Sequence, residues 1–180
     1  MRVFWEKGYE AASLSDLTHA MGINRPSMYA AFGNKEQLFC KVLDRYAGDQ
    51  AAFVSRAIKK TSIKDVVETI FHGAAAFLGS KEHPRGCLLV QGTPACGDAS
   101  DTVKRAIIER RLAGETLVCR RLKRAADEGA LAPNAKAADL AKFISTVVHG
   151  MSVQAANGAK WAQLQSIADI AVGACRGWLR

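Results

Sequence analysis

The chain has 180 residues, of which 49% are hydrophobic and 23% charged, a composition that supports a buried core and excludes a disordered tail. No apolar run approaches the roughly 18 to 20 residues that span a bilayer, and no signal-peptide pattern opens the chain, so we expect a cytoplasmic protein without a membrane partner. Four prolines and long stretches without turn clusters favour an all-α fold over many short strands.

Residues 1–7 are apolar and aromatic, which is typical of the end of a helix, and Gly8 would stop that helix. Ser13 then caps a second helix, with Asp16 at the spacing of a capping box. One apolar stripe with helical spacing follows in Leu14, Leu17 and Met21.

Gly22 is expected to end this helix in a tight turn, because glycine adopts the left-handed conformation easily. Asn24 caps a third helix, and Pro26 falls in its first turn, where the missing N–H costs little. The inward face of this helix is Met28, Ala31 and Phe32. The residues left outside are Arg25, Pro26, Tyr29 and Ala30, with Ser27 at the margin.

Another cap follows at Asn34, where Gln37 completes a further capping box. Lys35 lies at the positive end of the dipole of this next helix, which is unfavourable for a cation unless an anion such as a phosphate lies there. Residues 13–39 therefore predict a helix, a tight turn and a second helix, followed directly by another helix.

These residues carry a resemblance to a known family. The runs G-Y-E-A-A-S, D-L-T-H-A-M-G-I, R-P-S-M-Y-A-A-F and N-K-E-Q-L-F resemble the DNA-binding domain of the TetR family of transcriptional regulators. The resemblance implies an all-helical homodimer that regulates transcription and releases its operator when a small molecule enters the C-terminal domain. It also implies a helix-turn-helix domain at residues 1–46 and a regulatory, ligand-binding and dimerisation domain at residues 47–180. In that family a full first helix comes earlier, often after a basic arm, so we expect the chain to begin partway through this helix.

The formal net charge of +8 does not come from the expected DNA-binding domain. Residues 1–50 hold six Lys and Arg and six Asp and Glu, so the surplus lies downstream. Eight basic residues occur at spacings expected for the wet side of a long helix: Lys104, Arg105, Arg110, Arg111, Arg120, Arg121, Lys123 and Arg124. We expect a solvated face there, and the alternative is a surface for a second anionic partner.

The rest of the chain predicts further helices. Helical signals continue from Lys35 towards Ile58, and a new helix begins after Ser62, with Asp65 repeating the capping pattern. Residues 79–86 form a loop, residues 87–90 a short core helix rather than a buried strand, and Ser100 starts a long helix that Gly129 ends. Two apolar helices remain, over residues 136–156 and 160–179.

The last two helices are too apolar to be covered on one side only. In the resembling family they pack against their symmetry mates as a four-helix bundle, which implies a homodimer here; ordinary intramolecular core is the alternative. The predicted interface residues are Val147, Met151, Trp161, Leu164, Ile167 and Trp178.

The two helix-turn-helix domains of a two-fold dimer, here called its reading heads, must lie about 34 to 36 Å apart to enter successive major grooves of double-stranded operator DNA. Arg25 is the candidate for a base edge, whereas Ser13, Ser27, Tyr29 and Lys35 are candidates for phosphates. Alternatively, the ring of Tyr29 packs in the small core of the DNA-binding domain. The predicted DNA-binding set is Ser13, Asn24, Arg25, Pro26, Ser27, Tyr29 and Lys35.

A mostly apolar cavity for a small-molecule effector is expected in the C-terminal domain, and plain core is the alternative for each candidate. His149 could orient a polar ligand group or lie satisfied in the core or interface. The candidate lining residues are Phe71, Phe77, Leu89, Gln91, Ile108, Leu112, His149 and Met151.

Five cysteines without a C-x-x-C pair, and four scattered histidines, make no recognisable metal set, so we expect free thiols and no metal or cofactor. Cys87 follows Arg85, where a cation could favour the thiolate, so a redox or electrophile sensor is an alternative reading. No nucleophile elbow, phosphate loop or Glu-x-x-His array appears, so an enzyme is not expected. A protein-interaction module with a vestigial helix-turn-helix is the other alternative.

Overall fold

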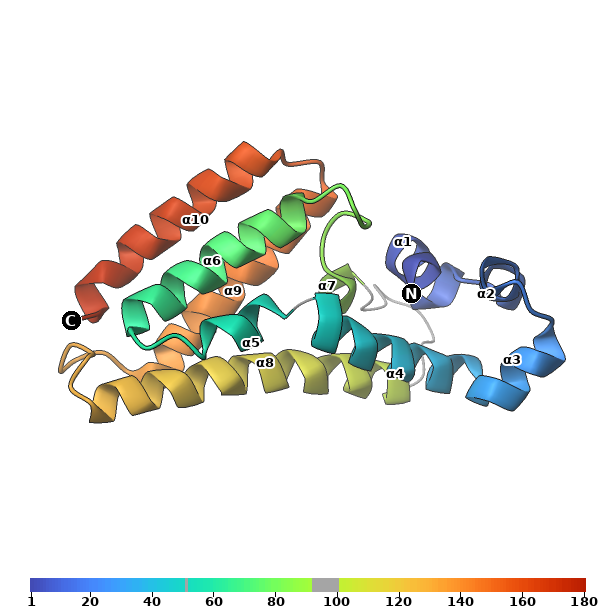
Figure 1. Cartoon of the computed structure of the whole chain (residues 1–180), viewed down its shortest axis with the longest axis horizontal. Coiled ribbons are helices and arrows are strands. Elements are labelled where there is room, and N and C mark those ends of the chain that lie inside the picture. The colour runs from blue at the N-terminus through green and yellow to red at the C-terminus, as the bar shows by residue number, and fades with distance from the viewer. Residues whose placement is uncertain (51, 92–100) are drawn as a thin grey trace. The chain divides into compact units, whose positions relative to one another are not determined.

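The structure of the chain is a computed structural model that describes residues 1–50, 52–91 and 101–180, and only the backbone of residues 49 and 50. Within these ranges the regular structure is helical (Figure 1), apart from one isolated β-bridge between Leu131 and Leu179. The predicted all-α class, with an N-terminal helix-turn-helix and a C-terminal helical part, is therefore confirmed.

The described helices follow the predicted order closely. They are α1 (Arg2–Ala11), α2 (Leu14–Met21), α3 (Arg25–Phe32), α4 (Lys35–Arg45), a π-helical turn (Tyr46–Gln50), α5 (Phe53–Ala57), α6 (Ile63–Gly79), α7 (Leu88–Gln91), α8 (Asp101–Asp127), α9 (Ala137–Ala156), α10 (Trp161–Cys175) and a 3₁₀ turn (Arg176–Trp178). The predicted short core helix is α7, so the strand alternative for residues 87–90 is wrong.

The helix starts lie where the caps predicted them. The Asn34 side chain accepts a hydrogen bond from the Gln37 amide at 2.8 Å, and the Gln37 side chain accepts from the Asn34 amide at 3.1 Å. A Cβ on Gly33, whose φ is +81°, would collide with the Gln37 side chain, so this box requires glycine there. The expected box at Ser62 is wrong, because Ser62 accepts from the Lys64 amide at 3.2 Å instead of pairing with Asp65.

Two helices differ from the predicted pattern. Gly8 breaks α1 with φ +75°, as expected, but a further helical turn follows it to Ala11. The helix that begins at Lys35 is α-helical only to Arg45 and continues as the π-helical turn, a feature that hydrophobic spacing does not reveal.

The described chain divides into two compact units, of which the first comprises Met1–Gln50 and Cys87–Arg111. Its core is aromatic. The Phe39 ring lies 4.9 Å from Phe4 and 5.1 Å from Tyr9, between centroids, and Trp5 meets Tyr46 edge-on at 4.8 Å. Phe39 and Tyr46 are fully buried, so α4 is held against α1 by these rings.

The segment Cys87–Arg111 belongs to the first unit through specific polar contacts. The Tyr46 hydroxyl donates to Cys87 Sγ at 3.1 Å, and Arg110 donates to Asp44 Oδ1 from Nη2 at 2.6 Å and from Nε at 3.0 Å. Arg111 donates to the carbonyl oxygens of Leu89 and Val90 at 2.7 and 3.1 Å, which caps the end of α7. The domain boundary expected after residue 46 remains a prediction.

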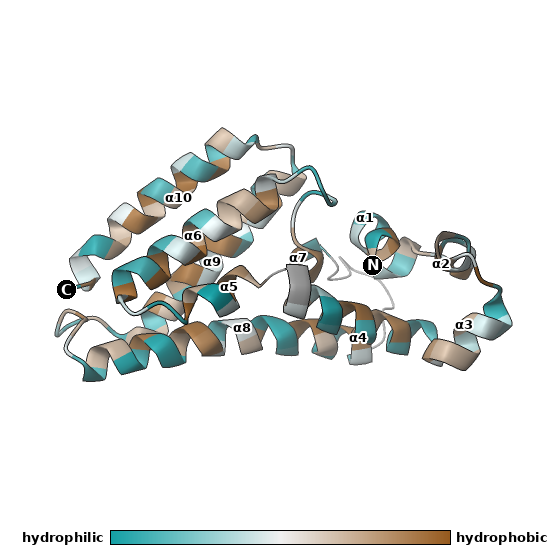
Figure 2. Ribbon diagram, viewed as in Figure 1, coloured by the Kyte–Doolittle hydropathy of each residue, from teal (hydrophilic) through white to brown (hydrophobic). Residues whose placement is uncertain are grey.

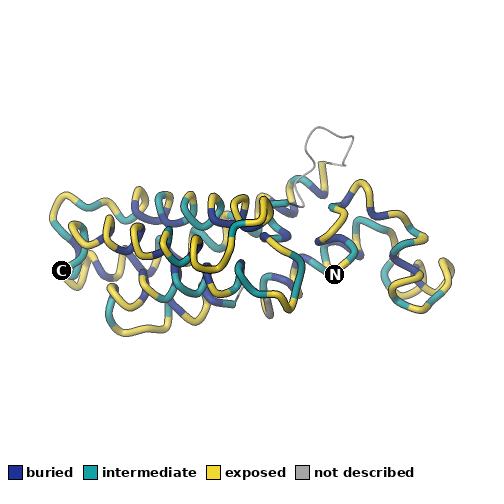
Figure 3. The backbone as a smooth tube through the Cα atoms, turned by 90° about the horizontal axis from the view of Figure 1, so that it is seen from above, coloured by how far each residue is buried: buried dark blue, intermediate teal, exposed yellow. Residues whose placement is uncertain are grey.

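The second unit comprises Ala51–Gly86 and Leu112–Arg180. Within it α6 contacts α5, α9 and α10, and each of these helices buries one side, so dark blue and yellow alternate along them in Figure 3. Gly79 gives the Trp161 side chain room, because a Cβ there would lie 2.9 Å from the indole. The chain end folds back, since the Arg180 amide donates to the Ala130 carbonyl at 2.9 Å.

The basic residues of α8 do not form the uniform solvated face that we expected. Polar and apolar residues alternate along α8 (Figure 2), but three of its arginines point into protein contacts. Arg110 and Arg111 bind Asp44 and α7, and Arg121 is only 5% exposed. The prediction holds for Arg105, Arg120, Lys123 and Arg124, which are exposed.

We expect the substitution Phe39→Ala to lower the free energy of unfolding by about 3 to 5 kcal/mol, because it leaves a cavity between α1 and α4. Urea unfolding followed by circular dichroism measures this. Phe32→Ala is the matched control, since Phe32 is only half-buried at the end of α3. Equal losses in the two variants would contradict the central role of Phe39.

Candidate nucleic-acid interface

The first helix of the motif, α2, is fixed at both ends. Ser13 Oγ accepts from the Asp16 amide at 3.0 Å and donates to Asp16 Oδ2 at 2.7 Å, and Gly22 closes the helix with φ +67°. Lys7 Nζ lies 2.7 Å from Asp16 Oδ1, which ties α1 to α2. Hydrogen bonds from Lys7 and Ser13 hold the pKa of Asp16 well below its usual range. Ser13, predicted to contact phosphate, is therefore already engaged in the cap, although it is exposed.

The second helix, α3, buries only Met28 of its predicted inward face, because Ala31 is exposed and Phe32 is half-buried. Met28 is 0% exposed, whereas Arg25, Pro26 and Ser27 are exposed. Tyr29 is 45% exposed, so its ring is not packed in the small core, the alternative that the sequence left open. Asn24 caps α3 by accepting from the Ser27 amide at 2.8 Å, which fixes where the helix begins.

Arg25 starts α3 and reaches towards α2. Its Nη2 donates to Ser15 Oγ at 2.9 Å, and both side chains are exposed. A hydrogen bond between exposed groups is easily exchanged for another acceptor. The guanidinium is therefore held near the outer side of α3 in a position from which it can turn to a ligand.

Lys35 lies at the first turn of α4 and is half-buried. Its Nζ donates to the Glu10 carbonyl at 3.3 Å and lies 4.5 Å from the centre of the Tyr9 ring. Desolvation lowers the pKa of this ammonium, and the nearby Glu10 opposes the shift. Lys35 therefore also links α4 to α1, a second role that sequence spacing did not indicate.

The effector-site candidates are divided between the two units. Leu89, Gln91 and Ile108 lie in the first unit, and the other five lie in the second. Phe71 and Met151 are buried, and the Phe77 ring lies 4.4 Å from His83. Ile108 and Leu112 are about half exposed, at 49% and 50%, so neither lines a closed cavity within its unit.

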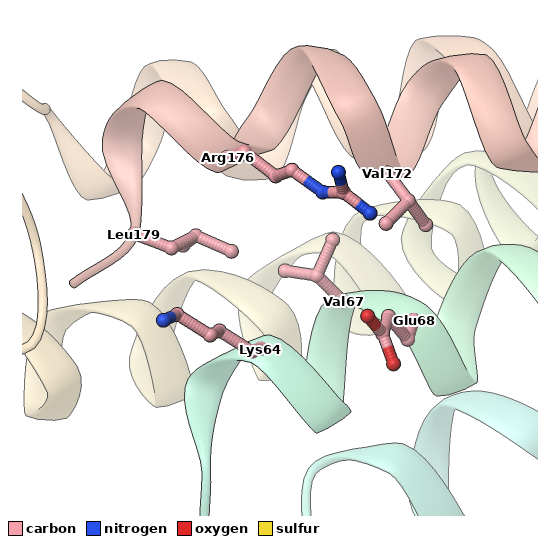
Figure 4. A pocket seen from close by; sticks show the side chains of 6 residues that line it. All are labelled: Lys64, Val67, Glu68, Val172, Arg176 and Leu179. Atoms are coloured by element: carbon pink, nitrogen blue, oxygen red, sulfur yellow. The ribbon is translucent and has the colours of Figure 1, made fainter.

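A pocket of the second unit lies between α6 and α10 (Figure 4), and none of the predicted effector residues lines it. Two cations, one carboxylate and three aliphatic side chains surround it: Lys64, Arg176, Glu68, Val67, Val172 and Leu179. Sequence reasoning missed this set, because its members come from two parts of the chain more than a hundred residues apart.

The predicted interface residues differ in exposure. Met151 and Leu164 are 1% and 0% exposed, so they belong to the core of the second unit. Contrary to our expectation, their side chains are not exposed for contact with a second chain. Trp161 is 55% exposed, and Val147, Ile167 and Trp178 are half-buried. The apolar residues that α9 and α10 expose further are Val153 at 46% and Ile170 at 70%. Helical spacing from Ile167, three residues earlier on α10, could have found Ile170.

Among the described residues there is no group of His, Cys, Asp and Glu that could hold a metal ion. Cys40, Cys87, Cys119 and Cys175 are free thiols, and Cys96 lies outside the described residues. No helix in the described ranges is long and apolar enough to cross a membrane.

Comparisons with known proteins agree with this geometry. Residues 1–42 match the model of bacterial regulatory proteins of the tetR family, and residues 64–159 match the tetracyclin repressor-like C-terminal domain. The HTH-type transcriptional repressor ComR of Escherichia coli (strain K12) is 36% identical over 176 residues, which cover 93% of this chain and 81% of ComR. The repressor BdcR of the same strain is 29% identical over 171 residues, or 94% of this chain and 81% of BdcR.

Solved structures extend the match to three dimensions. A cysteine mutant of the TetR family transcriptional regulator CifR, complexed with 26bp double-strand operator DNA, is 36% identical with a TM-score of 0.90. The match covers 96% of this chain and 91% of that chain. Two family models, a curated relative at this identity and a superposable fold together show that the chain belongs to the TetR family of bacterial regulatory proteins.

Proposed function

We propose that the chain is a DNA-binding transcriptional repressor that binds a palindromic operator as a homodimer and leaves it when a small-molecule effector binds. The observation that carries this proposal is the outer face of α3, where Arg25, Pro26, Ser27 and Tyr29 are exposed around a buried Met28. The names of ComR and BdcR as repressors, and the operator complex of CifR, support it.

The roles within α3 follow from chemistry. A guanidinium can donate two hydrogen bonds to the O6 and N7 of guanine, so Arg25 is the proposed base reader. Asn24, Ser27 and Tyr29 offer polar groups to phosphates, which fix register without reading sequence. Pro26 brings a short, rigid surface to the groove. Ser13 and Lys35 would contribute phosphate contacts while keeping their structural roles.

A homodimer is required because one eight-residue helix reads only a few base pairs. The proposed interface uses apolar residues that α9 and α10 expose, Val153, Trp161 and Ile170. Exposed Gly150 and Gly173 lie on the same helices and allow close approach of a second copy. Two reading heads would then address grooves about 34 to 36 Å apart.

The effector is proposed to bind in the part matched by the tetracyclin repressor-like C-terminal domain. Phe71, Phe77, His149 and Met151 of α6 and α9 remain the candidates there, and Leu112 belongs to the same unit. Leu89, Gln91 and Ile108 lie on α7 and α8 in the first unit, and their role at an effector stays a prediction. Access to chromosomal DNA supports a cytoplasmic location.

The two alternatives receive less support. A vestigial reading head would have no reason to keep an exposed Arg25 beside a fully capped α3. Thiol sensing at Cys87 is disfavoured because burial raises the pKa of this thiol, and the hydrogen bond from Tyr46 opposes the shift only in part.

Arg25→Ala should reduce the preference for operator over random DNA by about 10- to 100-fold, because a bidentate contact to guanine contributes about 1 to 3 kcal/mol of discrimination. Fluorescence anisotropy with both duplexes measures this. Lys35→Ala is the comparison variant, expected to weaken both duplexes equally. An unfolding curve for Lys35→Ala separates DNA contact from its bond to Glu10, and identical preference losses in both variants would refute the division.

Ile170→Glu should weaken self-association by about tenfold or more, because a carboxylate would be buried in an apolar contact. Sedimentation velocity of the variant measures the change. Leu117→Glu, which also places a charge at a partly exposed apolar position, is the matched control and should leave the dimer intact. An unchanged Ile170→Glu dimer would move the interface elsewhere.

Cys87 should react with iodoacetamide more slowly than Cys119 at neutral pH, since a raised pKa keeps its thiol protonated and the thiolate is the nucleophile. Peptide mass spectrometry of the timed reaction gives both rates. Faster labelling of Cys87, accompanied by loss of operator binding, would restore the sensing hypothesis.

A further inference from the structure

The pocket between α6 and α10 lies wholly within the second unit and has a cavity volume of about 210 Å³. Its floor is aliphatic, because Val67 of α6 and Val172 of α10 are 1% and 7% exposed. Pockets for drug-sized ligands take about 300 to 1,000 Å³, and an engineered cavity of about 150 Å³ binds benzene. This pocket therefore suits a small molecule of about eight non-hydrogen atoms.

The segment after α10 fixes one wall of the pocket. The chain leaves α10 through the 3₁₀ turn and reaches Leu179, whose backbone is extended. The Ala132 amide donates to the Trp178 carbonyl at 3.0 Å. The Arg180 amide donates to the Ala130 carbonyl at 2.9 Å. These hydrogen bonds hold the residues on both sides of Leu179, so this wall is formed before any ligand arrives.

Three charged side chains line the pocket and are available to a ligand. Lys64, Glu68 and Arg176 are exposed, and no ion pair or side-chain hydrogen bond joins them to the described part of the chain. Lys64 and Glu68 are four residues apart on α6, but a lysine that precedes a glutamate is the weaker order of such a pair. Both signs of charge can therefore serve a bound molecule.

The charges are distributed unevenly around the pocket (Figure 4). The Arg176 guanidinium and the Glu68 carboxylate lie towards the end marked by Val172, whereas the Lys64 ammonium lies at the end where Leu179 is. A cation and an anion at one end suit a ligand that carries both charges on neighbouring groups. A simple carboxylate would meet Arg176 but would also approach Glu68, which repels it.

We propose that this pocket binds a free aliphatic α-amino acid of about the size of valine. The α-carboxylate accepts hydrogen bonds from the Arg176 guanidinium, whose planar fork matches a carboxylate. The α-ammonium donates to Glu68, and the aliphatic side chain runs over Val67 towards Leu179. The site is independent of the DNA-binding function, because it includes neither α3 nor any predicted effector residue.

The test is isothermal titration calorimetry of the full chain with L-valine, isovalerate and isobutylamine. Isovalerate lacks only the amino group of valine, and isobutylamine lacks only the carboxylate. Each should bind at least about tenfold more weakly than L-valine, because each loses a hydrogen bond between charged groups. Equal affinities of L-valine and isovalerate would overturn the zwitterionic ligand, and the absence of saturable binding at millimolar L-valine would overturn the site.

Variants locate the binding. Arg176→Met and Glu68→Gln should each weaken L-valine binding by about 10- to 100-fold. Arg120→Met and Asp65→Asn are the matched controls, because they remove the same charges from exposed positions outside the pocket and should leave the affinity unchanged. Equal losses in the pocket variants and the controls, or no loss in any variant, would overturn this pocket.

Methyl NMR of the unsubstituted chain decides the matter even where Arg176→Met does not fold. L-valine should shift the methyl signals of Val67, Val172 and Leu179, and the signals of Val153, an exposed residue of α9 outside the pocket, should stay in place. Shifts that spare the three pocket residues would overturn the proposal and would leave the proposed repressor function untouched.

Discussion

The packing of aromatic rings between α1 and α4 is the constraint on which the reading head depends. Phe39 is fully buried between Phe4 and Tyr9, so the start of α4 cannot move without disturbing α1. Lys35 adds a cation over the Tyr9 ring on the same side. Because α3 ends only three residues before α4 begins, the direction of its outer face is set by this aromatic contact and by the cap at Asn34.

Arginines of α8 serve the fold more than the surface charge. Arg111 and Arg121 each donate to two backbone carbonyl oxygens, of α7 and of the loop before α6, and Arg110 pairs with Asp44. Part of the net positive charge is thus used to join segments distant in sequence.

The sequence predicted what local chemistry decides. Ser13, Asn24 and Asn34 cap the expected helices because a cap depends on residues within one turn. The exposure of Arg25, Pro26 and Tyr29 on α3 followed from the same short-range spacing, but the prediction of an inward Ala31 is wrong, since it is exposed. Contacts between distant segments were not predictable: nothing near Arg121 indicates that it meets Thr61, and the inward turn of Leu164 depends on which neighbours α10 acquires. The motif that carries the family resemblance is also local, so the sequence could indicate the class of function. The effector residues depend on contacts between distant segments, and they remain a proposal.

The first unit is discontinuous along the chain, since Met1–Gln50 is completed by Cys87–Arg111. An excised peptide ending at residue 50 would lose the hydrogen bond of Tyr46 to Cys87 and the partner of Asp44, and would uncover the side of α1 that contacts α7. Transplanting this reading head onto a foreign regulator therefore demands a graft of two separate pieces, and a simple swap of N-termini would yield a poorly folded chimaera.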